Sequence, residues 1–263
     1  IAPTMQFGIG VRKLISRIKN EEDKGSSDLK VYAQSFNGIE LNSSYYSTPS
    51  SAQIASWKSE VPEGFRFFPK APKAVTFRAS ASLPRVEWDH YLRSLEDFGS
   101  HLGDSFLQFS PHMTTDHKIY LFQILKALPS RYRFHIELRH PSWFVDLTMW
   151  DKLCDYLHKK SVGLVITDTP GRRDVLHMCV TSPHLFVRFK GNNAHDSDFK
   201  RIDDWIHMTS KVPSLSSLAF FHHHSEESHC ADTIAYMRKQ LVSVSSNALP
   251  EIRWKANPQM GLF

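Results

Sequence analysis

The sequence has few cysteines and lacks several short motifs that would place it in a familiar class of enzyme. Its three cysteines are Cys154, Cys179 and Cys230, and no two of them form a C-x-x-C pair. This argues against a disulfide framework or a zinc ribbon and favours a reducing compartment. Gly8-x-Gly10 is not followed by the third glycine of a dinucleotide fingerprint, and the chain has no P-loop and no G-x-S-x-G elbow. No cofactor is therefore predicted.

Long apolar runs are also absent. No stretch approaches the roughly 18 apolar residues of a membrane span, and no charged-then-apolar leader marks a secretory signal. We therefore expect a cytoplasmic protein without a membrane partner. The net charge of +5 favours anionic partners, although no single run is basic enough to indicate nucleic acid by itself.

The chain is long enough for one large domain. Of its 263 residues, 41% are hydrophobic and 22% are charged, a composition typical of a soluble protein with a sizeable core. Residues 5–263 are interpreted as a single domain. Residues 1–4, which precede Met5, are interpreted as a remnant of cloning.

Short apolar segments alternate with helical patterns along the chain. Eight segments are interpreted as strands: 6–10, 38–42, 65–70, 105–109, 133–138, 162–167, 184–189 and 215–221. Such alternation indicates a parallel sheet, and eight units predict an α/β fold of the (β/α)8 TIM-barrel type. We expect irregularity at the first strand and in the seventh unit, because residues 169–182 are too few and too polar for a full helix.

The segment Phe134–Trp143 carries the clearest functional signal. An apolar strand runs into Glu137 and Arg139 before Pro141 ends it. Side chains two positions apart on a strand share a face, so His135 lies on the same face as these two charges and the apolar residues take the other. This is typical of a barrel strand whose outer face is covered by helices and whose inner end lines a site.

Active sites of such barrels lie at the carboxyl ends of the strands, so the polar residues there form the candidate site. From the second strand to the eighth they are Glu40 and Asn42, Lys70, Gln108, Glu137 and Arg139, Asp168, Arg188, and His222. Three acids face three bases in this ring, so each charge has a partner. A purely structural alternative is that these ion pairs only tie the strands together.

The residue types suggest a division of roles. Three cationic side chains suit a phosphate or carboxylate group: Lys70, Arg139 and Arg188. Because burial and neighbouring charge shift carboxyl pKa values, three carboxyl groups are the catalytic candidates: Glu137, Asp168 and Glu40. The remaining rim residues would orient the substrate: Asn42, Gln108 and His222.

Histidines and aromatic residues add further candidates. Strand alternation lets either His222 and His224 or His223 alone face inward, and His222 with a rim carboxylate could bind a divalent ion. The simpler alternative is that these histidines are rim residues without a metal, and no metal is predicted. Tyr46 and Trp143 follow the second and fifth strands and would either stack on a sugar or base or pack the rim.

Several of these stretches resemble the YecE-like family, known as domain of unknown function 72, whose fold is a TIM-type barrel. Residues 137–143, ELRHPSW, match its E-F-R-H-x-S-W stretch, and residues 36–46, FNGIELNSSYY, match F-N-x-V-E-x-N-S-x-F-Y. Residues 8–11, GIGV, differ from its usual G-T-S-G-W opening. Phe221 precedes three histidines where the family has F-N-N.

The leading hypothesis is an enzyme that acts on a small anionic substrate by acid–base chemistry, with hydrolase, lyase and isomerase reactions all open. One alternative is a metal-dependent nucleic-acid-processing barrel resembling endonuclease IV, which rests on the basic charge and on fold analogy. The other is a barrel that binds a ligand without catalysis.

Overall fold

A computed structural model describes residues 4–9, 18–77, 82–225 and 229–244 of the chain. The sequence also predicts a helix over residues 12–20, and residues 258–263 resemble the usual tail of the family. Most of that helix and all of the tail lie outside the described ranges, as do residues 10 and 11 of the unusual opening. The first strand begins at Thr4, one residue before the expected domain boundary.

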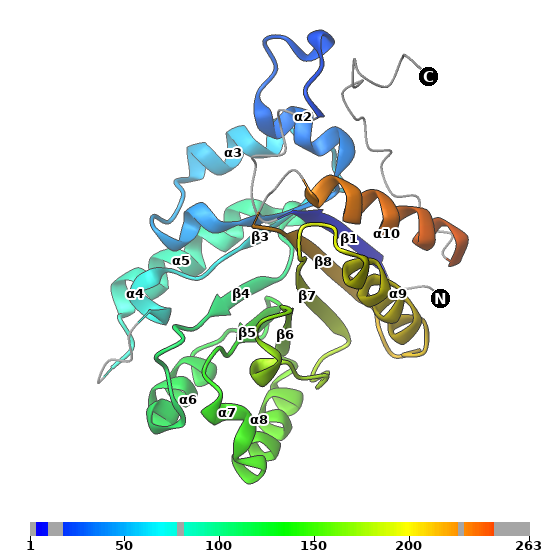
Figure 1. The fold of residues 1–263 in the computed structure, drawn as a ribbon. Coiled ribbons are helices and arrows are strands. Elements are labelled where there is room, and N and C mark those ends of the chain that lie inside the picture. Colours follow the sequence, from blue (N-terminus) through cyan, green and yellow to red (C-terminus); the bar gives the residue numbers. More distant parts are fainter. Residues whose placement is uncertain (1–3, 10–17, 78–81, 226–228, 245–263) are drawn as a thin grey trace.

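The described residues form parallel strands that alternate with helices. The strands are β1 (Thr4–Ile9), β2 (Gly38–Leu41), β3 (Arg66–Pro69), β4 (Ser105–Gln108), β5 (Phe134–Glu137), β6 (Gly163–Asp168), β7 (His184–Lys190) and β8 (Ser217–His223). The helices are α2 (Asp28–Ser35), α3 (Ser51–Ser59), α4 (Lys73–Thr76), α5 (Arg85–Phe98), α6 (Lys118–Lys126), α7 (Ser142–Val145), α8 (Leu147–Lys160), α9 (Asp196–Ser210) and α10 (Cys230–Val244). The helices lie outside the strands (Figure 1).

The strands pair in two parallel sheets. One has six strands in the order β1-β8-β7-β6-β5-β4, and the other consists of β2 and β3. Only isolated bridges, such as that between Lys70 and Phe106, connect β3 to the β4 side, and among the described residues no ladder joins β1 to β2. The expected α/β fold is confirmed, whereas a closed ring of eight paired strands is not observed. The four-residue lengths of β2 and β3 explain part of the difference, as does Pro69, which has no N–H to donate.

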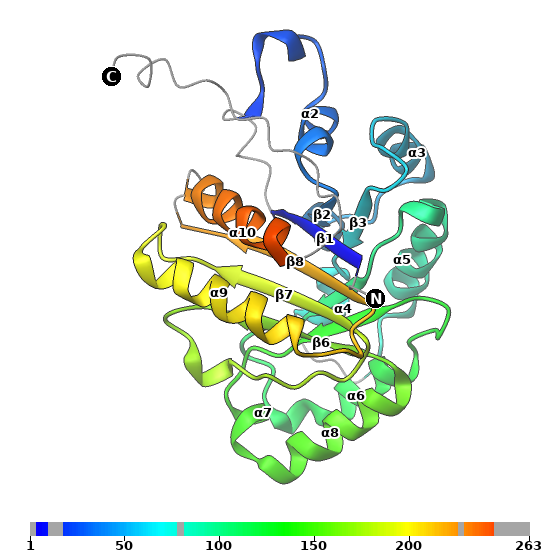
Figure 2. The same ribbon diagram turned by 90° about the vertical axis from the view of Figure 1, so that its right-hand side faces the viewer.

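The irregular unit expected from residues 169–182 is present. Between β6 and β7 the chain forms only a single 3-10 turn, η6 (Arg173–Val175), and no α-helix. Elsewhere long helices cover the strands, and α9 and α10 lie side by side over β7 and β8 (Figure 2). Among the described residues, no helix has the length and the apolar character that crossing a bilayer would require.

Local sequence signals explain where α8 begins and ends. Asp146 caps its first turn, with Oδ1 accepting from the backbone N of Met149 at 3.0 Å. Ser161 ends the helix in a left-handed conformation, with φ of 54°. Leu153 and Leu157, four residues apart, are buried against the outer face of the sheet.

A compact cluster of buried side chains fills the space enclosed by the strands. Its members are Phe68, Phe106, Val165, Phe186, Ala219 and Phe221. The ring of Phe68 lies 4.9 Å from that of Phe221 and 5.6 Å from that of Phe186, measured between centroids. The candidate site lies next to this cluster, on its side toward the carboxyl ends of the strands.

Candidate functional site

Polar side chains lie one inward-facing position beyond the buried cluster on five strands. Since side chains alternate along a strand, the residue two positions after each cluster member faces the same way. These residues are Lys70 after Phe68, Gln108 after Phe106, Thr167 after Val165, Arg188 after Phe186 and His223 after Phe221. Glu137 on β5 joins the layer, since it is in register with Gln108 on β4.

Arg188 is the centre of this layer and binds two carboxylates from other strands. Its Nε and Nη2 lie 2.8 Å and 3.2 Å from the two carboxylate oxygens of Glu40, a bidentate pair. Its Nη1 donates to Oε2 of Glu137 at 3.1 Å. The side chains of Glu40 and Glu137 are 0% and 2% exposed, and that of Arg188 is 14% exposed, so these charges are largely removed from water.

Glu137 is held by two neutral donors as well. Gln108 donates from Nε2 to Oε2 at 2.9 Å, and Thr167 donates from Oγ1 to Oε1 at 2.9 Å. Burial acts to raise the pKa of Glu137, but the positive charges of Arg188 and Arg139 outweigh it and lower that pKa. Glu137 is therefore an ionised carboxylate at neutral pH.

Glu40 is ionised for the same reason. Burial opposes the charge, whereas Arg188 and His223 lower the pKa of Glu40 well below its ordinary value. His223 reaches Glu40 with its Nε2 at 3.4 Å from Oε1. Asn42 donates to Oε2 of Glu40 at 3.4 Å. Glu40 thus pairs with both the imidazole of His223 and the guanidinium of Arg188, and it lies behind the residues that line the pocket.

Lys70 lies on the opposite side of Gln108 from Glu137. Its Nζ donates to Oε1 of Gln108 at 2.7 Å and lies 4.2 Å from the centroid of the Tyr45 ring. Burial and the positive charge of Arg188 lower the pKa of Lys70 to about 8. Gln108 therefore connects a buried ammonium group to a buried carboxylate.

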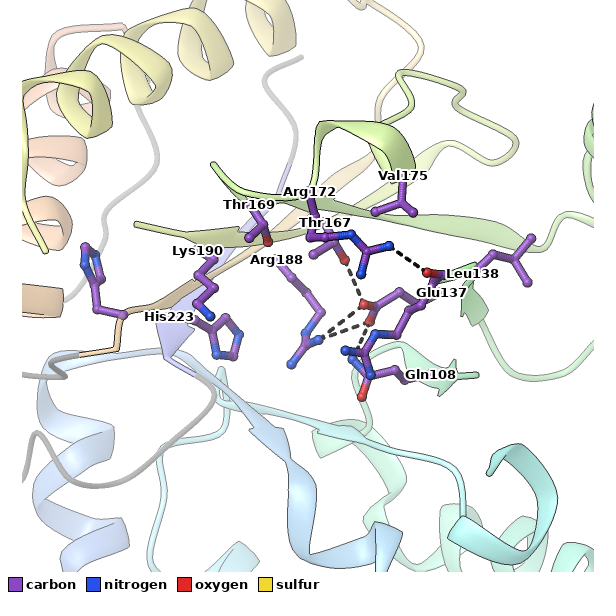
Figure 3. Close-up of a pocket in the computed structure, with 12 residues that line it drawn as sticks. Gln108, Glu137, Leu138, Thr167, Thr169, Arg172, Val175, Arg188, Lys190 and His223 are labelled. Atoms are coloured by element: carbon purple, nitrogen blue, oxygen red, sulfur yellow. Dashed lines mark hydrogen bonds and ion pairs between the residues drawn. The ribbon is translucent and has the colours of Figure 1, made fainter. Parts of the chain in front are cut away.

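A cavity of about 410 Å³ opens onto this network at the carboxyl ends of the strands (Figure 3). Its lining consists of Gln108, Glu137, Leu138, Arg139, Thr167, Thr169, Arg172, Val175, Arg188, Lys190, His223 and His224. Glu40 and Lys70 do not line it, and each lies one hydrogen bond behind a residue that does. Of the residues that the sequence predicts at the strand ends, Gln108, Glu137, Arg139 and Arg188 line this cavity.

Asp168 is not part of this pocket, contrary to the sequence prediction. It is buried on the outer face of β6, where α9 covers the sheet. Its carboxylate pairs with Arg173 at 2.6 Å and Arg201 at 2.9 Å, and accepts from Nε1 of Trp205 at 2.9 Å. Because Thr167 faces inward, the next residue along the strand must face outward. Asp168 therefore contributes to the packing of α9 against β6 and not to the pocket.

The prediction for His222 is corrected in the same way. Since Phe221 and His223 point inward, His222 points outward and is buried beneath α10, with Nδ1 3.2 Å from Oγ1 of Thr233. Its ring lies 5.1 Å from that of Phe220. His223 and His224 line the pocket instead. A metal-ligand role for His222 at the rim does not fit this position.

The two aromatic candidates also lie away from the cavity. Trp143 is fully buried among the helices, and its Nε1 donates to the backbone oxygen of Met113 at 2.7 Å. Tyr46 is 80% exposed and contacts Tyr45 edge-on, with centroids 5.0 Å apart. Trp143 thus packs the fold, and Tyr45 rather than Tyr46 contacts the charged network.

Four polar residues that line the pocket were not considered in the sequence prediction: Thr167, Thr169, Arg172 and Lys190. His223 and His224 were named only as alternatives for the inward face of the last strand. Lys190 lies two positions after Arg188 on β7, and that spacing was a usable signal. Arg172 comes from the irregular segment after β6 and reaches the pocket by donating to the backbone oxygen of Arg139 at 3.1 Å. No sequence pattern indicated that contact.

The described residues bring together no three His, Cys, Asp or Glu side chains in an arrangement that could hold a metal ion.

Comparison with known proteins identifies relatives along nearly the whole chain. The family model described as "Protein of unknown function DUF72" matches residues 19–257. UPF0759 protein YecE of Escherichia coli K12 is 21% identical over 246 residues, which cover 87% of this chain and 89% of that protein. The resemblance inferred from the sequence motifs is thereby confirmed.

Solved structures of the same family have a similar fold. A DUF72 family protein from Enterococcus faecalis V583 is 20% identical, with a TM-score of 0.71 over 92% of this chain and 99% of that chain. A DUF72 family protein from Thermotoga maritima MSB8 is 18% identical, with a TM-score of 0.70 over 91% of this chain and 99% of that chain. At these identities the likeness supports the fold alone.

Proposed function

Since this chain belongs to the DUF72 family, described as proteins of unknown function, we propose a function from the pocket itself: an enzyme that binds a small phosphate- or carboxylate-bearing substrate. The proposal treats the strand ends as one rim of a (β/α)8 barrel, where ligands of such folds bind. It assigns no cofactor. The single observation that carries it is the surplus of positive charge around the cavity.

The charges within and behind the pocket wall balance one another. Arg188 and Lys70 supply two positive charges, and Glu40 and Glu137 supply two negative charges. Arg172 is paired with Asp174 at 2.9 Å. Among the described residues no ion pair engages Arg139 or Lys190, and both side chains line the cavity. Their charges are available to an anion, and a guanidinium and an ammonium that line one cavity suit phosphate or carboxylate.

The pocket also contains groups suited to proton transfer. His223 lines the cavity and is oriented by Glu40, an arrangement that resembles a carboxylate-supported general acid or base. Glu137 faces the same space as a fixed carboxylate, which suits it to stabilise positive charge on a substrate or to accept a proton. In the proposal His223 takes the acid–base role that the sequence hypothesis gave to Asp168.

A thermal-shift screen of inorganic phosphate, sugar phosphates and small dicarboxylates tests the proposed substrate class. A ligand that binds only the folded chain raises the melting temperature in proportion to the logarithm of its concentration. We expect stabilisation by anions of this size and none by neutral sugars matched in size. Equal effects of charged and neutral compounds would contradict the proposal.

Two further measurements separate the alternatives. A ligand that stabilises the chain but is recovered unchanged after prolonged incubation would favour a binding barrel without catalysis. The nucleic-acid-processing alternative predicts salt-dependent retention on DNA, and no cluster of metal-ligating side chains among the described residues supports it.

A further inference from the structure

Two of the three cysteines face each other at close range. The Sγ atoms of Cys154, on α8, and Cys179, in the segment between β6 and β7, lie 3.1 Å apart. A disulfide has an S–S distance of about 2.05 Å, so a shift of about 1 Å brings these sulfurs to bonding distance. Both side chains are partly exposed, whereas Cys230 is fully buried.

Independent contacts on both sides hold the two thiols in this arrangement. Alternate side chains of the segment face the protein: Nε2 of His177 lies 3.2 Å from the backbone oxygen of Val165, and Oγ1 of Thr181 donates to the backbone oxygen of Val162 at 2.7 Å. Cys179 lies between them and shares their orientation, whereas Met178 and Val180 are 50% and 42% exposed.

The helix presents its thiol on the matching face. Trp150 and Cys154 are four residues apart on α8 and therefore lie on one side of the helix. The ring of Trp150 contacts that of His177, with centroids 5.2 Å apart. This contact, which lies next to the thiol pair, thus fixes the position of α8 relative to the segment that carries Cys179.

We propose that Cys154 and Cys179 form a reversible disulfide, a modification site that ties the segment after β6 to α8. The hydrogen bond between the sulfurs raises the pKa of Cys154 and lowers that of Cys179, so Cys179 is the attacking thiolate. This inference does not depend on the proposed function.

The oxidant is a low-molecular-weight disulfide of the glutathione class. The Cys179 thiolate attacks one of its sulfurs, forms a mixed disulfide and releases one small thiolate. Cys154 then loses its proton to water, and its thiolate attacks the Cys179 sulfur and displaces the second small thiolate. Two protein thiols are oxidised and one small disulfide is reduced to two thiols.

The bond would restrain a segment that contributes to the candidate pocket. Arg172 and Val175 line the cavity and precede Cys179 in the same segment, which no α-helix stabilises. Oxidation therefore restricts the movement of the segment that forms part of the pocket wall. It also closes a loop of chain between the two cysteines, which restricts the unfolded state.

Oxidation of the full chain by oxidised glutathione, followed by counting of free thiols, tests the proposal. We expect the three thiols per chain to fall to one, a tryptic map with a Cys154–Cys179 link, and a rise in melting temperature of roughly 5–10 °C that a dithiol reductant reverses. Trypsin should also cleave more slowly after Arg172 and Arg173 in the oxidised chain.

Serine variants provide the controls. Cys154→Ser and Cys179→Ser should each lose the link and the temperature rise, whereas Cys230→Ser should keep both and retain no free thiol after oxidation. Three thiols that persist at equilibrium, or a stable glutathione adduct on one cysteine without the link, would overturn the proposal. The thiol count of the wild-type chain after oxidation gives this answer even if a variant fails to fold.

Discussion

Nε of Arg188 lies 2.8 Å from Oε1 of Glu40, although the two residues are 148 positions apart in the chain. Glu40 belongs to the two-stranded sheet and Arg188 to the six-stranded one, and no strand ladder joins these sheets in the described residues. The pair therefore links the two sheets through side chains. It also fixes the guanidinium that neutralises Glu137 in the pocket wall.

Replacement of Arg188 by methionine should destabilise the fold. Two buried carboxylates would lose their common counter-charge, and breaking a buried ion pair in this way costs about 3–5 kcal/mol. Urea unfolding at pH 7 measures the loss. As a control, Arg131→Met removes an arginine whose pair with Glu96 is exposed, and it should cost less than about 1 kcal/mol.

The pH dependence of Arg188→Met should reveal the same pair. In the wild type the lowered pKa values of Glu40 and Glu137 provide stability above the unfolded value of about 4.3, which is lost as the pH falls through the folded values. The variant lacks this term, so the two unfolding free energies should converge as the pH falls below about 4. A constant difference down to pH 3 would show that Arg188 stabilises the fold by packing alone.

Glu137→Gln and Asp168→Asn should affect different properties of the chain. Because Glu137 lines the cavity, removing its charge leaves Arg188 less compensated, and the affinity for inorganic phosphate should rise several-fold at low salt. Asp168→Asn should leave phosphate affinity unchanged and reduce stability by about 2–4 kcal/mol, since Arg201 loses one of its two buried carboxylate partners and keeps only Asp198. Titration calorimetry and urea unfolding separate the two. A change in phosphate affinity with Asp168→Asn would contradict its placement.

Lys70→Met should alter how stability depends on alkaline pH. The folded pKa of Lys70 is about 8, below the unfolded value of about 10.4. Between these values the unfolded chain binds more protons, so the wild type should gain about 1–3 kcal/mol relative to the variant as the pH rises from 8 to 10.4. Unfolding in urea at pH 7, 8.5 and 10 measures the gain.

The exposed Lys126 on α6 provides the control for this experiment. Lys126→Met should differ from the wild type by the same amount at all three pH values. If Lys70→Met behaves likewise, the ammonium group of Lys70 is not desolvated in the folded chain.

The sequence predicted the parallel strands correctly because short apolar segments alternate with helical ones along the chain. It predicted the inward face of β5 correctly because apolar and charged residues alternate within that strand. Apolar and charged residues take turns from Phe134 to Arg139, so the inward position of Glu137 follows from the two-residue repeat. The polar segment after β6 was also expected to lack a helix, since it has too few apolar residues to pack as one.

Asp168 and His222 were misplaced because their strands do not alternate. Leu164–Ile166 and Leu218–Phe221 are apolar on both faces, as buried parallel strands usually are, so the sequence gives no sign of which face is inside. Only the packing of Val165 and Phe221 into the central cluster settles it. The contact of Arg172 with the pocket depends on an irregular segment, for which no periodic rule exists.

Titration of inorganic phosphate into the Arg139→Ala/Lys190→Ala double variant tests the central claim most directly, with the wild type and Arg131→Ala measured alongside at low salt. The account predicts that phosphate binds the wild type and Arg131→Ala with equal affinity and that the double variant loses at least tenfold, which corresponds to about 1.4 kcal/mol. If phosphate binds all three proteins with equal affinity, or binds none of them, the result contradicts an anion site in this pocket.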